Sequence, residues 1–283
     1  MDAKIPIEQF EVFAGGLDHP ECCAFDRVGN LWAGGEAGQI YRIDPAGQVK
    51  TMANVGGFCC GVALSPDDQE LFVCVSGVGV VRVSKQGAHQ SFASHAGDYK
   101  IVAPNYLLFD QRGRLYVTDS GNWMKRNGFL LRFDADGIGT VLAGPFGYAN
   151  GLALSADEQS LFMVESDTDS VLRFDIRADA TLTQPEIYAN HVGRLPDGIA
   201  LDAAGNLYIC CYASDEIWRI GVDGQKTLVG HDRWGILLGR PTNLAFGGLN
   251  FDEIYVANLG RYTITRAKLG IRGRLPANLA DAT

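Results

Sequence analysis

Six residues with reactive, polar or metal-binding side chains stand at matching places in six similar stretches of the chain, roughly 40 to 50 residues apart. They are Glu21, Cys60, Asn105, Asn150, Asp197 and Thr242. Each one begins an apolar segment that resembles a strand, although Glu, Asn and Asp are poor strand residues. Burying their oxygens costs free energy unless a partner satisfies them, and a divalent cation is one such partner.

The three protein ligands that we propose for a cation are Glu21, Asn150 and Asp197, which supply two carboxylates and one amide oxygen. Such oxygen ligands suit Ca²⁺, Mg²⁺ or Mn²⁺, and Zn²⁺ and Fe²⁺ also accept them. Three protein ligands leave coordination positions open for water and substrate, as a catalytic site requires. Asn105, at the same repeat position, is a candidate to bind substrate or a water on the metal. A ring of hydrogen-bonded side chains around channel water is the alternative, and the residue types fit both.

The elements that must position these residues form one repeated sequence pattern. It consists of an apolar strand, a turn rich in Asp, Gly, Ser and Asn, and a second strand with an aliphatic-aromatic-aliphatic core. The second strands are Leu31–Ala33, Leu71–Val73, Leu115–Val117, Leu161–Met163, Leu207–Ile209 and Ile254–Val256. A third strand follows with an arginine in register each time, at Arg42, Arg82, Arg132, Arg173, Arg219 and Arg266. Turns such as the one at 202–206 contain the Asp, Gly and Asn residues that favour β-hairpins.

Six such copies, each with about four strands, predict an all-β, six-bladed β-propeller with four-stranded antiparallel blades. We expect residues 1–283 to form one propeller domain. The sixth copy has no clear fourth strand, so the N-terminal segment at about residues 7–13 is predicted to close the last blade and remove its exposed edge. Because the innermost strand of each blade lines the central channel, the six matching residues would form a ring around one point.

The composition indicates the class of protein and disfavours some classes of partner. Hydrophobic content is 47% and charged content 20%, as in a globular protein. The net charge of −9 and the lack of a basic tract disfavour nucleic acid and anionic membranes as partners. Residues 1–13 lack the apolar run of a signal peptide, and no apolar stretch is long enough for a membrane span. Seven cysteines without CxxC spacing predict reduced thiols in a cytoplasmic protein.

Several stretches in this order resemble the SMP-30/gluconolactonase (regucalcin-like) family over essentially the whole chain. They are His19–Glu21, Ala103–Asn105, Ala149–Ser155, Pro196–Gly198, Cys211–Tyr212 and Pro241–Gly248. The resemblance implies a six-bladed propeller with one divalent metal in the channel and hydrolysis of sugar lactones. It also implies that Glu21, Asn150 and Asp197 are the metal ligands, and that Asn105 contacts the substrate.

The chain departs from animal members of that family beside Asn105. Those members have an Arg two positions earlier, where Ala103 stands here, and an Asp just after, where Tyr106 stands. A substrate-contacting Glu has no match in the loop 122–128. The loss of these polar groups predicts a substrate that is less polar than gluconolactone, or differently shaped.

The hypothesis is therefore a metal-dependent lactonase in which the cation polarises the carbonyl and water attacks. Asp197 is the candidate to accept the proton of that water, although coordination to a cation would weaken it as a base. Tyr106 and Trp123 are candidates to contact the substrate, and Lys125, Arg126 and Tyr148 to shape the pocket. Cys60 is expected to be a wall residue rather than a nucleophile, and Glu165 fits a structural anchor or a substrate contact equally well.

Two other functions fit the same scaffold. One is a phosphotriesterase-like hydrolase that uses a similar metal ring, and the other is a calcium-binding protein without catalytic activity. For the lactonase and for the phosphotriesterase-like hydrolase, the expected partner is a small-molecule substrate. The expected assembly is a monomer or a weak homo-oligomer.

Overall fold

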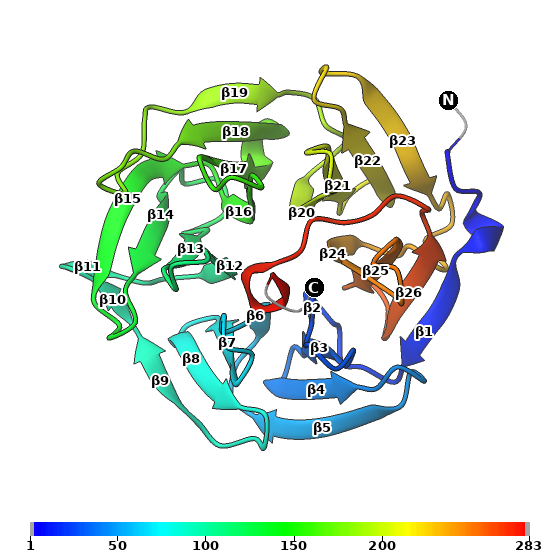
Figure 1. Cartoon of the computed structure of the whole chain (residues 1–283), viewed down its shortest axis with the longest axis horizontal. Coiled ribbons are helices and arrows are strands. Elements are labelled where there is room, and N and C mark those ends of the chain that lie inside the picture. Colours follow the sequence, from blue (N-terminus) through cyan, green and yellow to red (C-terminus); the bar gives the residue numbers. More distant parts are fainter. Residues whose placement is uncertain (1–2, 281–283) are drawn as a thin grey trace.

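The computed structural model describes residues 3–280, which fold into six antiparallel four-stranded sheets arranged around a central axis (Figure 1). The predicted all-β, six-bladed propeller is confirmed. No α-helix occurs in these residues, and three short 3-10 turns span Ile7–Gln9, Ser166–Thr168 and Ala277–Leu279. None of the helices described is long and apolar enough to cross a membrane.

Each blade runs outward from an innermost strand at the axis. The first three blades are β2(Cys23–Phe25), β3(Leu31–Gly34), β4(Gln39–Ile43) and β5(Val49–Asn54); β6(Cys59–Leu64), β7(Glu70–Val75), β8(Gly79–Ser84) and β9(His89–Ala93); and β12(Pro104–Phe109), β13(Leu115–Asp119), β14(Gly128–Phe133) and β15(Gly139–Phe146). The last three are β16(Ala149–Leu154), β17(Ser160–Glu165), β18(Ser170–Asp175) and β19(Glu186–Ala189); β20(Pro196–Leu201), β21(Leu207–Cys211), β22(Glu216–Ile220) and β23(Lys226–His231); and β24(Pro241–Gly247), β25(Glu253–Asn258) and β26(Thr263–Lys268) with β1(Glu11–Gly15). A small hairpin, β10(His95–Ala96) and β11(Tyr99–Lys100), separates the second and third blades.

The N-terminal strand β1 forms the outermost strand of the sixth blade by pairing with β26. It begins later than the expected 7–13, because residues 7–9 form a 3-10 turn and the pairing starts at Glu11 opposite Arg266. The Arg266 Nε also donates to the Glu11 carboxylate at 2.7 Å. The first and last parts of the chain thus complete one sheet, which closes the ring.

The repeated aromatic residue and the repeated arginine of each copy face each other across the second and third strands. The pairs are Trp32 and Arg42, Phe72 and Arg82, Tyr116 and Arg132, Phe162 and Arg173, Tyr208 and Arg219, and Tyr255 and Arg266. Cross-strand pairs of this kind stabilise a sheet and help to set its register. The arginines therefore have a structural place within each blade.

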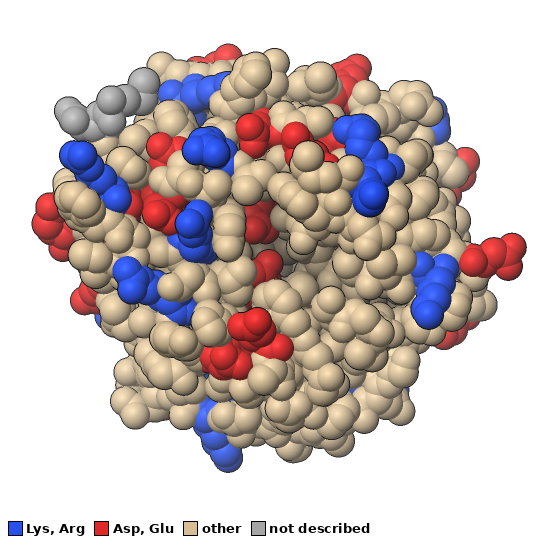
Figure 2. Space-filling model, turned by 180° about the vertical axis from the view of Figure 1, so that it is seen from behind, with Lys and Arg blue, Asp and Glu red and all other residues tan. Residues whose placement is uncertain are grey.

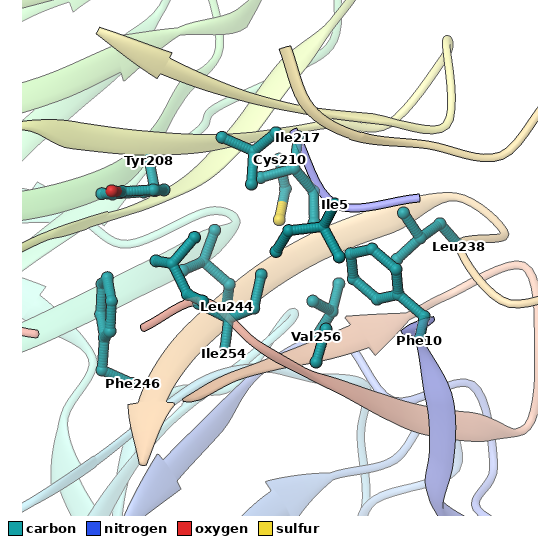
Figure 3. Packing of buried hydrophobic residues seen from close by; sticks show 13 residues of the cluster. Ile5, Phe10, Tyr208, Cys210, Ile217, Leu238, Leu244, Phe246, Ile254 and Val256 are labelled. Carbon is teal, nitrogen blue, oxygen red and sulfur yellow. The ribbon is translucent and has the colours of Figure 1, made fainter. Parts of the chain in front are cut away.

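The hydrophobic core consists of six clusters, and each lies between two neighbouring blades. Figure 3 shows the cluster between the fifth and sixth blades, where Tyr208 and Cys210 face Leu244 and Val256. Phe10, from the N-terminal segment, packs against the same cluster. Because every blade buries both faces, the aliphatic-aromatic-aliphatic strands are buried throughout, and the inner strands are held at fixed positions around the axis.

The C-terminal segment after β26 crosses one face of the ring and ends over the channel (Figure 1). The Asn278 side chain donates hydrogen bonds to the Phe25 carbonyl and to Asp68, and the Asn278 backbone carbonyl accepts one from Arg27 Nε. These contacts close the end of the channel where the innermost strands finish. The strands start at the opposite end, which is the face shown in Figure 2.

Candidate functional site

The six ring residues lie together where the innermost strands begin. Five of them are the second residue of β6, β12, β16, β20 or β24, and Glu21 precedes β2 by two positions. Their side chains are buried, with exposed fractions between 1% for Thr242 and 9% for Asn105 and Asp197. In Figure 2, acidic side chains gather around a hollow near the centre of this face.

The strand pairing is irregular at five of the six ring residues. In the second to sixth blades the register with the next strand shifts at the ring residue, for example between Ala149 and Leu152 and between Pro196 and Ile199. Such bulges redirect side chains and are frequent beside active sites. The bulge explains how Asn and Asp occupy a strand: the backbone there is already released from regular pairing.

Glycine follows the ring residue in three copies and allows close approach of neighbouring blades. A Cβ on Gly151 would lie 2.5 Å from the Asp197 carbonyl oxygen, and one on Gly61 would lie 2.6 Å from the Asn105 carbonyl oxygen. A side chain at either place would push the neighbouring inner strand away. The spacing of the ring therefore depends on these glycines.

Glu21 and Asp197 form a buried pair of acids. Burial raises the pKa of Glu21 well above its usual range, and the nearby Asp197 charge raises it further. Burial likewise raises the pKa of Asp197, while a hydrogen bond from Asn150 works in the opposite direction. Two carboxylates held together away from water are costly when both are ionised. A cation between them would offset that cost.

Two oxygen atoms of the proposed ligand set lack a hydrogen-bond partner within residues 3–280: Glu21 Oε2 and Asn150 Oδ1, both buried. Buried polar atoms are normally satisfied, so these two call for an explanation. Both are acceptors of the kind that divalent cations bind. Together with the raised pKa values, these two oxygens are compatible with a cation ligand set of Glu21, Asn150 and Asp197.

Hydroxyl groups between blades hold the ring backbone. Ser166 Oγ donates to the Pro196 carbonyl at 2.7 Å and accepts from Asn150 Nδ2 at 3.2 Å, which leaves Asn150 Oδ1 free. Ser120 donates to the Ala149 carbonyl, and Thr242 donates to the Glu21 carbonyl, each at 2.7 Å. The sequence reasoning missed Ser120 and Ser166. A signal existed, because Ser follows the second strand in the second, third and fourth copies, at positions 76, 120 and 166.

The other ring members differ in their surroundings. The Thr242 hydroxyl is engaged with backbone carbonyls. Burial raises the pKa of the Cys60 thiol well above its usual range, and the Glu21 charge adds to this effect, so the thiol stays protonated. No hydrogen bond to the Asn105 side chain occurs within the described part of the chain, which leaves its amide available.

We call the end of the channel where the ring lies the mouth. Tyr106 points away from it, toward the end that the C-terminal segment covers. It lines a cavity of about 150 Å³ between the innermost strands and the C-terminal segment. Burial raises its pKa, with further contributions from Cys22, Cys23 and Cys210. This cavity is mostly apolar, and Arg274 and Asn278 of the C-terminal segment also line it. The structure therefore does not bring Tyr106 together with the mouth residues, and its substrate contact stays a prediction.

Trp123 and Tyr148 stand together at the mouth. Their rings meet edge to face with centroids 4.9 Å apart, and Trp123 is 47% exposed. Burial raises the pKa of Tyr148, and the Asp197 and Glu21 charges raise it further. Arg126, from the same loop as Trp123, pairs with Glu165 at 2.9 Å.

Glu165 is an anchor for this corner of the mouth. Besides Arg126, its carboxylate accepts hydrogen bonds from the Gly147 backbone at 2.7 Å and from Thr168 Oγ1 at 2.9 Å. It thereby ties the Trp123 loop to the segment that presents Tyr148. Its oxygens are fully engaged, so the structural interpretation of Glu165 is the better one.

A second group of potential metal ligands comprises Asp18, His19 and Glu36. His19 Nδ1 lies 3.0 Å from both carboxylates, and Asp18 also accepts from Ala37 and Gln39. All three residues are at least partly exposed. Since their polar atoms satisfy one another, this group lacks the unpaired buried oxygens that distinguish the ring.

The structure thus defines the class of the protein as a six-bladed β-propeller with buried oxygen-bearing side chains where its innermost strands begin. The chain belongs to the family whose model is described as the SMP-30/Gluconolactonase/LRE-like region, which matches residues 19–259.

Individual relatives differ in what their names say they act on. A 6-deoxy-6-sulfogluconolactonase from Pseudomonas putida is 27% identical, with 80% of this chain and 78% of the relative covered. A diisopropyl-fluorophosphatase from Loligo vulgaris is 24% identical, with 78% of this chain and 80% of the relative covered. Among solved structures, a calcium-binding protein, regucalcin, from Agrobacterium tumefaciens is 18% identical, with a TM-score of 0.79 and 98% of both chains covered.

Proposed function

We propose that this protein is a metal-dependent lactonase that hydrolyses a sugar lactone or related lactone to the hydroxy acid. The observation that supports this best is the buried ring of Glu21, Asn150 and Asp197, two of whose oxygens have no hydrogen-bond partner within residues 3–280. Membership in the gluconolactonase-containing family supports the same conclusion.

Glu21, Asn150 and Asp197 would hold the cation, which supplies positive charge to polarise the ester carbonyl and stabilise the developing oxyanion. Asn105, whose amide is free, would orient the lactone by hydrogen bonding. Asp197 would accept a proton from the attacking water as the water oxygen bonds to the carbonyl carbon. The bond from that carbon to the ring oxygen then breaks, and the ring oxygen takes up a proton to give the hydroxy acid.

The test is a panel of lactones assayed with purified protein after chelation and after separate addition of Ca²⁺, Zn²⁺, Mn²⁺, Mg²⁺ and Fe²⁺. We expect hydrolysis that disappears with chelator and returns with a cation. Asp197→Ala should lower kcat by about 10²- to 10⁴-fold, the usual contribution of a general base. Hydrolysis that persists without a cation, or full activity in Asp197→Ala, would contradict the proposal.

A phosphotriesterase-like activity is the second candidate, because one relative is named as a diisopropyl-fluorophosphatase. Organophosphate esters in the same panel decide between the two: cleavage of these esters without turnover of any lactone would favour the second candidate. Cation binding without turnover of either class would indicate a calcium-binding protein.

A further inference from the structure

A second tier of side chains lies outside the ring, two positions before each ring residue. It comprises His19, Phe58, Ala103, Tyr148, Leu195 and Arg240. Each of these residues is partly or fully exposed, whereas every ring residue is buried. This outer tier is therefore the surface that a substrate meets before it reaches the ring.

The backbone holds four of these side chains in an unusual conformation. Residues 19, 148, 195 and 240 have left-handed φ values of 44°, 63°, 51° and 54°. This region is uncommon for residues other than glycine, and such strain concentrates at functional sites. The same conformation at the same repeat position in four blades shows that the fold presents these side chains in a regular way.

The chemistry of the outer tier divides into two sides. The second to fifth blades contribute Phe58, Ala103, Tyr148 and Leu195, which are apolar or aromatic. The sixth and first blades contribute Arg240 and His19. The apolar side continues into Trp123, which packs on Tyr148, and into Met124, which is 73% exposed.

On the polar side, His19 and Arg240 are engaged in contacts with neighbouring side chains. His19 is bound to Asp18 and Glu36. The Arg240 guanidinium lies over the Tyr212 ring at 5.2 Å from its centroid. The His19 ring also packs on that of Tyr262. This side therefore presents hydrogen-bonding and charged groups, whereas the outer-tier residues of the second to fifth blades are apolar or aromatic.

The apolar side is continuous with the proposed chemistry. Tyr148 links the two tiers, since its ring packs against that of Trp123 and it stands two residues before the ring residue Asn150. Phe58 packs against the cluster that contains Cys60, the ring residue of the same blade. A substituent on a lactone bound at the ring would therefore pass directly onto this surface.

We propose that Phe58, Tyr148, Leu195 and Trp123 form a binding surface for an alkyl or aryl substituent, so that the substrate is a hydrophobically substituted lactone rather than a polyhydroxylated one. This inference rests on the proposed lactonase function and specifies its substrate class. Each methylene group removed from water contributes about 0.8 kcal/mol, which corresponds to about a fourfold gain in kcat/KM.

The experiment measures kcat/KM for γ-butyrolactone, for γ-lactones with butyl and octyl chains, and for glucono-δ-lactone. We expect kcat/KM to rise with chain length and to exceed that for glucono-δ-lactone. Trp123→Ala should lower kcat/KM for the octyl lactone about tenfold more than for γ-butyrolactone. Trp234→Ala is the matched control, because Trp234 is 73% exposed in the loop between β23 and β24 and outside this surface; it should not change the chain-length dependence.

Hydrolysis of lactones with no dependence on chain length, or equal effects of the two tryptophan substitutions, would overturn the inference while leaving the lactonase proposal in place. If no lactone is hydrolysed, the lactonase proposal fails, and the surface is tested by binding alone. Tryptophan fluorescence is then followed while the octyl lactone is added to the wild type and to Trp123→Phe. A change that is confined to the wild type supports the surface, and an identical change in both overturns it.

Discussion

At the scale of single residues, the ring combines groups that are individually unfavourable to bury. Glu21 and Asp197 are acids in a buried setting, and Asn150 has a buried oxygen without a partner in the described residues. A protein tolerates such groups when another requirement outweighs the cost in stability. For this ring, we infer that the requirement is cation binding.

Replacing Glu21 by Gln separates that requirement from stability. The amide keeps the shape of the side chain but cannot ionise beside Asp197. We expect lactone hydrolysis to fall at least about 100-fold, while the melting temperature of the chelator-treated protein stays equal or rises. Parallel assays of turnover and thermal unfolding check this. A large fall in the melting temperature of the chelator-treated protein would show that Glu21 is a structural residue instead.

Ser166 is expected to act through Asn150 rather than on the substrate. Ser166→Ala removes the hydroxyl that receives Asn150 Nδ2, so the amide loses its fixed orientation. Supporting contacts of this kind typically change metal affinity by about 10- to 100-fold. Calorimetric titration with Ca²⁺ or Mn²⁺ measures the loss. Ser155→Ala is the control, because Ser155 bonds Asp157 in the turn between β16 and β17; it should leave the affinity unchanged.

At the scale of elements, the innermost strands position the ring through bulges and glycines. Bulges release five of the ring residues from regular pairing, and the glycines that follow three of them allow the strands to lie close to one another. The contact between β16 and β20 is the most informative, because these strands present Asn150 and Asp197.

Gly151→Ala tests that contact. The added Cβ would meet the Asp197 carbonyl oxygen at 2.5 Å, so the two strands must separate. Overpacking of this kind costs about 1–3 kcal/mol of unfolding free energy, and we expect activity to fall with it. Denaturant unfolding and turnover measure the two effects. Gly15→Ala is the control, since among residues 3–280, apart from Gly15 and its two chain neighbours, no heavy atom lies within 4 Å of the added Cβ; a similar loss in both variants would contradict the packing argument.

At the scale of the whole molecule, the two ends of the chain have different structural roles. The N-terminal strand completes the sixth blade, and the C-terminal segment closes the channel on the face opposite the ring. The proposed site lies at the other end of the channel, where the innermost strands begin.

Asn278→Ala tests whether the C-terminal segment serves stability alone. The substitution removes hydrogen bonds to the Phe25 carbonyl and to Asp68 in a buried place. Leaving such partners unsatisfied costs about 1–3 kcal/mol each, so the melting temperature should fall. Because the segment lies across the channel from the ring, KM for a hydrolysed lactone should not change. A raised KM would show that the two ends of the channel are coupled.

How much the sequence could predict is clearest from particular residues. The aromatic and arginine positions recur in every copy, so their pairing across strands could be predicted, as could the six blades. The alignment of the copies also brought Glu21, Asn150 and Asp197 to one column. It could not show that Tyr106, the direct neighbour of Asn105, lines the far cavity, because that direction depends on the bulge in β12.

The sequence by itself determined the fold and the membership of the ring, because strand periodicity and repeat spacing are local properties of the chain. Only the tertiary structure decided which oxygens lack partners, which hydroxyls tie one blade to the next, and which side chains form the outer tier. These features arise between blades, from residues about one repeat apart or from opposite ends of the chain. Their contacts depend on how closely the six innermost strands approach the axis, which no single copy specifies.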